Sequence, residues 1–173
     1  GGPAGRAVAC VRGVGVNACA AAERGWGGRG KKSGLWGGGG AGQAAKSCNN
    51  MIVAVSMIAV GEGFALAEKR GLSHQALFDV ASTSSGQCWA LTTYCPVPGP
   101  VPTSPANNGY KPGCASSLMV KDLTLAQDAA KATGAATPLG KHAQEIYKAF
   151  DAAGNGGVDF SGIIQHVRSL AGK

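Results

Sequence analysis

The chain has 173 residues, of which 45% are hydrophobic, and its mean hydropathy is +0.04. A chain of this length and composition can bury one substantial core, so we expect a single soluble globular domain with a tail. The longest apolar run, Met51 to Val60, is too short to cross a bilayer, which argues against a membrane partner. The net charge of +7 comes mostly from the first 39 residues.

The six cysteines show no C-x-x-C spacing and have no paired histidines nearby. This pattern supports neither zinc binding nor a secreted disulfide framework. We therefore expect free thiols in a reducing compartment and no metal site.

Residues 1–39 are rich in glycine, alanine and arginine and lack an apolar period. Such a segment buries too little surface to offset its ordering entropy, so we expect it to be disordered. Three interpretations stay open: an organelle transit peptide, a truncated or mistranslated segment, and a basic tail that meets nucleic acid. Aromatic residues are few here, which disfavours nucleic acid as a partner.

A long helix is predicted from Gln43 to about Arg70, with Gly71 closing it. Helical spacing places Lys46 and Asn50 on one face, one turn apart, at the polar end of a helix that is otherwise apolar on nearly every side. Lys46 is therefore either a lysine at the rim of a core helix or a working group. The helix's internal glycines, Gly61 and Gly63, are interpreted as marks of close packing.

Further helices follow in chain order. Ser73 is the predicted N-cap of a helix over 74–82 with Val80 among its inward residues, and His74 is expected at the surface. A short helix over 87–94 precedes a proline-rich segment, which predicts an extended, ordered loop. The last three predicted helices cover 115–133, with Leu118, Leu125, Ala126 and Ala129 on one side, then about 138–150, and a segment opened by Asp159. No convincing strand follows residue 40, so the predicted fold class is all-α.

Two motifs match familiar patterns only in their letters. The glycines from Gly37 to Gly42 fit G-x-G-x-x-G, but no strand precedes them, so we do not interpret them as a dinucleotide fingerprint. The stretch from Asp151 to Val158 resembles part of an EF-hand loop. It has Ala153 and Gly162 where two calcium ligands belong, so an ordinary glycine-rich turn explains it.

The pattern Gly37-x-x-Gly40-x-Gly42-x-x-x-Lys46-x-x-x-Asn50 resembles the signature of the β-hydroxyacid dehydrogenase family, and in particular its 3-hydroxyisobutyrate dehydrogenase branch. Four later segments resemble the same family in the same order: 84–89, 94–99, 104–108, and 118–126, which contains Lys-Asp-Leu. Four linked segments make a stronger signal than any one of them. The resemblance covers roughly residues 37–170 and implies the helical C-terminal domain of 6-phosphogluconate dehydrogenase-like proteins, a bundle with a long first helix. The predicted organisation is therefore a segment 1–39 and a helical domain 40–173, with no complete Rossmann domain.

The resemblance implies an oxidoreductase that moves hydride between NAD and the primary alcohol of a small β-hydroxy acid in valine breakdown. It assigns the acid/base role to Lys46. It assigns binding of the substrate carboxylate to Asn50, with its neighbour Asn49. Lys121 and Asp122 would face the cofactor; without the resemblance, Lys121 would be interpreted as a solvated helix residue. An ammonium positioned near the substrate oxygen stabilises the charge that builds there during hydride transfer. Trp89 and Tyr94 are interpreted as core and loop anchors.

Relatives in the family carry an N-terminal Rossmann domain, and residues 1–36 resemble no part of it. We therefore expect this chain alone to bind NAD weakly and to turn over slowly or not at all. The alternative is a non-catalytic dimerisation or interaction module. A rival enzyme would act on tartronate or succinic semialdehyde. The resemblance further implies a homodimer or homo-oligomer in the mitochondrial matrix, or in the cytoplasm of a bacterium.

Overall fold

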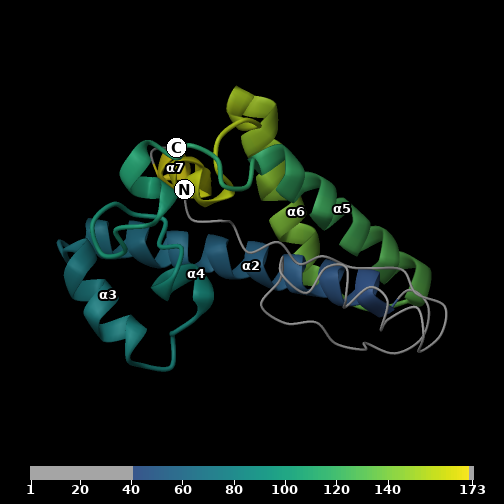
Figure 1. The fold of residues 1–173 in the computed structure, drawn as a ribbon, viewed down its shortest axis with the longest axis horizontal. Helices are drawn as coiled ribbons and strands as arrows, with labels where there is room; N and C mark the ends of the chain where they lie inside the picture. The colour runs from purple at the N-terminus through teal and green to yellow at the C-terminus, as the bar shows by residue number, and fades with distance from the viewer. Residues whose placement is uncertain (1–40, 172–173) are drawn as a thin grey trace, which may run out of the picture. The chain divides into compact units, whose positions relative to one another are not determined.

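The computed structural model describes residues 41–171, which form helices joined by turns and loops (Figure 1). The elements are α2 (Ala41–Lys69), α3 (His74–Ser82), α4 (Trp89–Thr92), η1 (Pro105–Asn108), α5 (Ser116–Thr133), α6 (Pro138–Phe150), η2 (Asp151–Asn155), η3 (Phe160–Gly162) and α7 (Ile163–Leu170). Within these residues no strand is present, and the one β-bridge joins Ala115 to Asp159. The predicted all-α fold class and its long first helix are confirmed.

The chain divides into two compact units, residues 1–49 and 50–173. The expected disordered segment 1–39 lies outside the described residues. Helix α2 starts in the first unit, and the second unit contains the rest of α2 and every later element. The fold described below is that of the second unit.

Helix α2 ends as its sequence predicts, because Gly71 adopts a φ of 73° just beyond it. A side chain disfavours this left-handed conformation, and glycine does not. By length and composition alone, the stretch Gly42–Lys69 is long and apolar enough to cross a membrane. The sequence estimate, which counted only Met51–Val60, was therefore an underestimate of the apolar length. A core helix of a soluble protein passes the same test, and Ala54 and Met57 in this stretch are fully buried.

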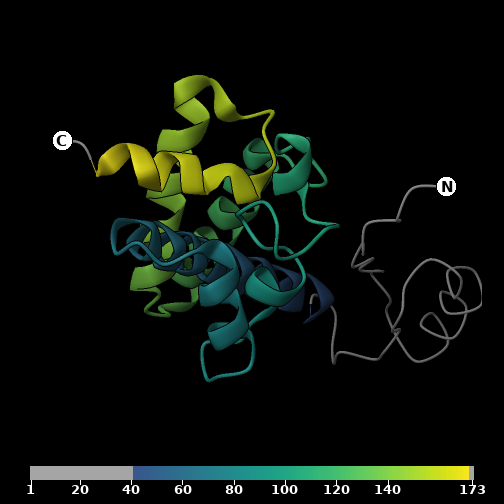
Figure 2. The same ribbon diagram turned by 90° about the vertical axis from the view of Figure 1, so that its left-hand side faces the viewer.

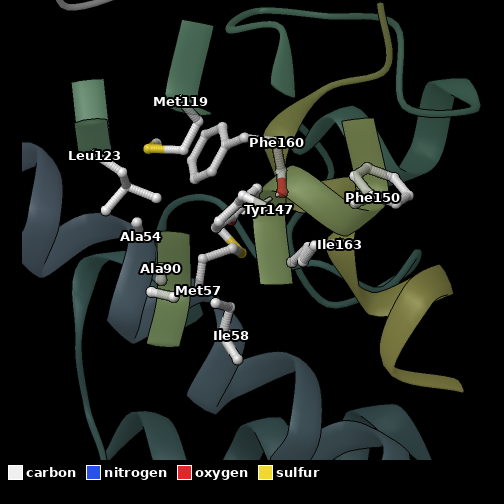
Figure 3. Packing of buried hydrophobic residues seen from close by; sticks show 11 residues of the cluster. Ala54, Met57, Ile58, Ala90, Met119, Leu123, Tyr147, Phe150, Phe160 and Ile163 are labelled. Carbon is white, nitrogen blue, oxygen red and sulfur yellow. Dashed lines mark hydrogen bonds between the residues drawn. The ribbon is translucent and has the colours of Figure 1, made fainter. Parts of the chain in front are cut away.

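The first hydrophobic core lies where α2 meets α5 and α6 (Figure 3). Met57 from α2 and Leu123 from α5 are fully buried, and so is Tyr147 from α6. The Tyr147 hydroxyl is satisfied because it donates to the backbone carbonyl of Phe160, 3.1 Å away. Burial of side chains of this size stabilises the fold by about 1.5–3 kcal/mol each.

A second core lies at the other end of α2, around Phe64 and Ile164. Helix α7 crosses α2 here (Figure 2) and packs against Gly61, where an added Cβ would be in van der Waals contact with the Cβ of Ile164 at 3.6 Å. The close packing predicted from Gly61 is therefore confirmed. At Gly63 it is wrong, because nothing lies within 4 Å of an added Cβ.

The proline-rich segment belongs to this second core and is folded back instead of extended. Val97 and Val101 are buried in it, and the Tyr110 hydroxyl donates to the Pro96 carbonyl at 2.8 Å. Asn107 pins the turn, because its amide donates to the Val101 carbonyl at 2.8 Å and accepts from the Gly99 N–H at 2.9 Å. The segment is ordered, as predicted, through these side-chain hydrogen bonds.

Two predicted inward faces are only partly right. In α3, Leu77 and Ala81 pack against the second core, but Val80 is 65% exposed. In α5, Ala126 is buried as predicted. On the same helix, Leu118 and Leu125 are 53% and 42% exposed, while Met119 and Leu123 face the core. His74 also differs from the surface position expected for it, because it is half-buried and its ring lies edge-on to Phe64 with centroids 5.7 Å apart.

Candidate functional site

Lys46 and Asn49 lie in the N-terminal turns of α2. This end of the helix forms because alanine, glutamine and lysine favour helix and no helix breaker follows until Gly61. Lys46 is half-buried and Asn49 is exposed. The shared face of Lys46 and Asn50 stays a prediction from the helical repeat of α2.

Asn50 is in direct contact with the Lys-Asp-Leu segment of α5. Its Nδ2 donates a hydrogen bond to the Oδ2 of Asp122, 2.7 Å away. The two residues are 72 positions apart, and both side chains are half-buried at the junction of α2 and α5. A short hydrogen bond to a carboxylate is stronger than one between neutral groups, so it fixes the plane of the Asn50 amide.

Lys121 precedes Asp122 and is exposed. The helical repeat places it on the same outward stripe of α5 as Leu118 and Leu125. This stripe, which we call the Lys121 face, runs beside Asp122 and points away from the core residues Met119 and Leu123. An ammonium between exposed leucines is accessible to a ligand that approaches this face.

An aromatic stack lies beside the first core. Trp89 packs on Tyr94 with ring centroids 4.9 Å apart, and Tyr94 packs on Phe160 at 5.2 Å. Burial, with Asp159 beside it, raises the pKa of Tyr94 above its ordinary value of 10.0. The hydroxyl therefore stays protonated and donates to the Oδ2 of Asp159 at 2.9 Å. Tyr94 is a core anchor, as predicted, whereas Trp89 is 38% exposed.

The described residues offer polar side chains that could face part of a dinucleotide, but they do not form a binding site for its pyrophosphate. A pyrophosphate cradle needs a strand followed by a glycine turn and a helix, and residues 41–171 contain no strand. They do offer an exposed cation at Lys121 next to the Asn50–Asp122 pair. Within the same residues, no three His, Cys, Asp or Glu side chains are grouped to hold a metal ion.

The sequence missed the role of Asp159 as the centre of a polar cluster. It was predicted only to open the last helix. In the structure it is the N-cap of η3, which leads directly into α7, and accepts from the Ser161 N–H at 3.0 Å. The structure also brings Tyr94, Gly113 and Cys114 to the same carboxylate. No local sequence signal reveals these partners, because they are distant along the chain.

Comparison with known proteins defines the class of this helical domain. Residues 40–167 match the family model described as the NAD-binding domain of NADP-dependent 3-hydroxyisobutyrate dehydrogenase. The chain belongs to this family.

Individual relatives agree with this assignment. The chain is 61% identical over 132 residues to a probable 3-hydroxyisobutyrate dehydrogenase of Mycobacterium tuberculosis, covering 76% of this chain and 45% of that protein. It is 44% identical over 129 residues to the mitochondrial 3-hydroxyisobutyrate dehydrogenase of Homo sapiens, covering 75% and 38%. A solved structure of the Mycobacterium tuberculosis enzyme with L-serine superposes with a TM-score of 0.85 at 53% identity, over 90% of this chain and 53% of that one. The chain thus spans less than half the length of these curated relatives.

Proposed function

We propose that this chain provides the helical, substrate-facing domain of a 3-hydroxyisobutyrate dehydrogenase that uses NAD. The observation that carries the proposal is the hydrogen bond between Asn50 and Asp122, which joins two of the sequence segments that resemble the family. The Mycobacterium tuberculosis relative was solved with L-serine, which is itself a small β-hydroxy acid. This supports the substrate class.

In this proposal, bound NAD would supply the hydride acceptor for the carbinol carbon of the substrate, and Lys121 and Asp122 would face the cofactor. Lys46 takes the hydroxyl proton as its amine and returns it as an ammonium in the reverse reaction. The bond between carbon and oxygen becomes a carbonyl as hydride and proton leave, so the product is a semialdehyde. Lys121 supplies a positive charge at the cofactor side.

Asn50 and Asn49 are assigned to the substrate carboxylate. A carboxamide has two N–H groups, and Asp122 accepts one from Asn50. The bond holds the Asn50 amide with its nitrogen toward Asp122, which fixes the orientation of the side chain assigned to the substrate carboxylate. Asp122 therefore acts on the substrate through Asn50, beside the cofactor role that the resemblance implies for it.

The acid/base assignment is tested by the NAD-dependent oxidation of 3-hydroxyisobutyrate by the 173-residue chain and its Lys46→Ala variant. We expect slow turnover and weak NAD binding, because the described residues lack a pyrophosphate cradle. Lys46→Ala should lower the rate by about 100-fold or more, and the Lys111→Ala control, on an exposed loop, should not. Activity that survives in Lys46→Ala contradicts the role of Lys46. A panel with tartronate and succinic semialdehyde identifies the substrate.

The positioning role of Asp122 is tested on substrate binding. Asp122→Asn should raise KM for the β-hydroxy acid about tenfold with a smaller change in kcat, since a hydrogen bond to a charged group contributes about 1.5–3 kcal/mol. Asp128→Asn, an exposed substitution on the same helix, is the matched control. An unchanged KM in Asp122→Asn would refute the positioning role.

A second candidate function is a non-catalytic interaction module, and the exposed apolar side chains of the second unit favour it. Ile52, Leu139 and Leu118 are 62%, 70% and 53% exposed. Ile52 and Leu139 line one hollow, and exposed apolar surface often marks a protein interface. A chain that forms a stable dimer by sedimentation velocity, yet neither binds nor oxidises any β-hydroxy acid, would support this candidate over the enzyme.

A further inference from the structure

A groove of about 600 Å³ runs between α5 and α6, away from the candidate active site. The helices lie side by side (Figure 1), and both contribute to the three lysines that line the groove. Helix α5 contributes Lys131, and α6 contributes Lys141 and Lys148. On α5 the helical repeat puts Lys131 on the opposite side from Asp122, so the groove and the Asn50–Asp122 pair open to different faces.

The groove is positively charged. Its three lysines are all exposed, and Asp128 is the sole acidic residue among the described residues that line it. Glu145, the nearby carboxylate on α6, does not line the groove and lies 3.4 Å from His142. A hollow lined by charges of one sign concentrates ions of the opposite sign.

The floor of the groove is a set of fixed hydrogen-bonding groups. The Gln144 amide donates to the Thr124 hydroxyl at 2.9 Å, and the Thr137 hydroxyl donates to the Gln127 carbonyl oxygen at 3.0 Å. The two bonds tie α5 to the start and the middle of α6. They hold polar groups in place beneath the lysines, so an anion that binds there meets an ordered floor.

We propose that this α5–α6 groove is a binding site for a small oligophosphate anion. Lysine binds phosphate oxygens as a mobile point charge, and lysines on both walls can converge on one anion. Lys141 and Lys148 lie seven residues apart, which is about 10.5 Å along the helix axis. Long lysine side chains from both walls can reach a short chain of phosphates across this span. The described lining contains no aromatic side chain for a nucleobase to stack on, so the groove suits the phosphates better than a nucleic acid.

The site is tested with tripolyphosphate as the probe, by amide-detected NMR titration of the 173-residue chain. We expect saturable shifts at the side-chain amides of Gln127 and Gln144 and at the backbone around Lys141. The six basic residues before residue 40 attract anions as well. Shifts confined to that segment, or shifts that do not saturate, overturn the proposal.

Charge-removing variants give the matched test. Lys131→Gln, Lys141→Gln and Lys148→Gln together should weaken the affinity for tripolyphosphate at least tenfold, and each alone about threefold. The control removes the same charge at Lys69, Arg70 and Lys111, which do not line the groove. Equal weakening in the control shows general attraction to a basic protein and refutes the site. Citrate at equal concentration should bind more weakly, and citrate binding as tight as tripolyphosphate would refute the preference for phosphate.

Discussion

Asp159 is fully buried, and both of its carboxylate oxygens accept hydrogen bonds. Oδ2 accepts from the Tyr94 hydroxyl and from the backbone N–H groups of Gly113 and Cys114, at 2.9–3.1 Å. Oδ1 accepts from the N–H and the hydroxyl of Ser161. A buried charge is tolerated only when it is surrounded in this way, so this single side chain ties the loop before α5 to the start of the last helical segment.

Asp159→Asn should therefore be strongly destabilising. The asparagine NH₂ group would face donors that now point at a carboxylate oxygen, leaving buried donors unsatisfied. We expect the free energy of unfolding to fall by about 3 kcal/mol. Urea denaturation followed by circular dichroism measures the change. For the control Asp79→Asn, an exposed change on α3, the free energy of unfolding should change by no more than about 0.5 kcal/mol. A loss below 1 kcal/mol at Asp159 would show that the cluster is not a main support of the fold.

At the scale of elements, helix ends were predictable because they depend on local chemistry. Ser73 accepts a hydrogen bond from the Ala76 N–H as an N-cap should, and Gly134 ends α5 with a φ of 72°. Pro138 occupies the first turn of α6. Each of these residues acts on a helix end no more than four residues away, so the sequence alone is sufficient to predict it.

The buried face of α5 was not predictable from the same information. The helix carries two apolar stripes, one through Leu118 and Leu125 and one through Met119 and Leu123, and only the second faces the core. Periodicity shows that a stripe exists and does not show which neighbour covers it. The bond from Asn50 to Asp122 was unpredictable for the same reason, because nothing local relates residues 72 positions apart.

The folded proline loop gives a test at this scale. Asn107→Ala removes the amide that holds the Val101 carbonyl and the Gly99 N–H together. We expect a loss of about 1 kcal/mol in the free energy of unfolding, since these groups are partly solvated, and faster hydrogen exchange at Gly99. Asn108→Ala, the exposed neighbour, is the control. Equal exchange at Gly99 in both variants would contradict the pinning role of Asn107.

Across the second unit, an ionic contact joins the last helix to the end of α2. Two nitrogens of Arg168 on α7 donate hydrogen bonds to the Glu68 carboxylate, and one of them, Nε, lies 3.1 Å from Oε2. Nε2 of His74 on α3 lies 2.7 Å from Oε1 of Glu68. The two ends of this contact are 100 residues apart in the chain. It therefore links three helices beside the second core, where α7 crosses α2.

The hydrogen bond from Arg168, with a further contribution from His74, lowers the pKa of Glu68 below its ordinary value of 4.5. The unfolded chain, with the ordinary pKa, takes up the proton first as the pH falls. The contribution of Glu68 to stability is therefore complete above about pH 4.5 and is lost as the pH falls through the lower, folded pKa.

We accordingly expect Glu68→Gln to lower the free energy of unfolding by about 1 kcal/mol at pH 7, a modest value because the pair is partly exposed to solvent. The difference between the variant and the natural chain should shrink as the pH falls below 4.5. Urea denaturation at a series of pH values measures it, with Glu62→Gln, an exposed change on the same helix, as the control. A difference for Glu68→Gln that stays constant from pH 7 to pH 3 would show that the variant acts through packing. In that case, the charge of Glu68 does not hold α7 to α2.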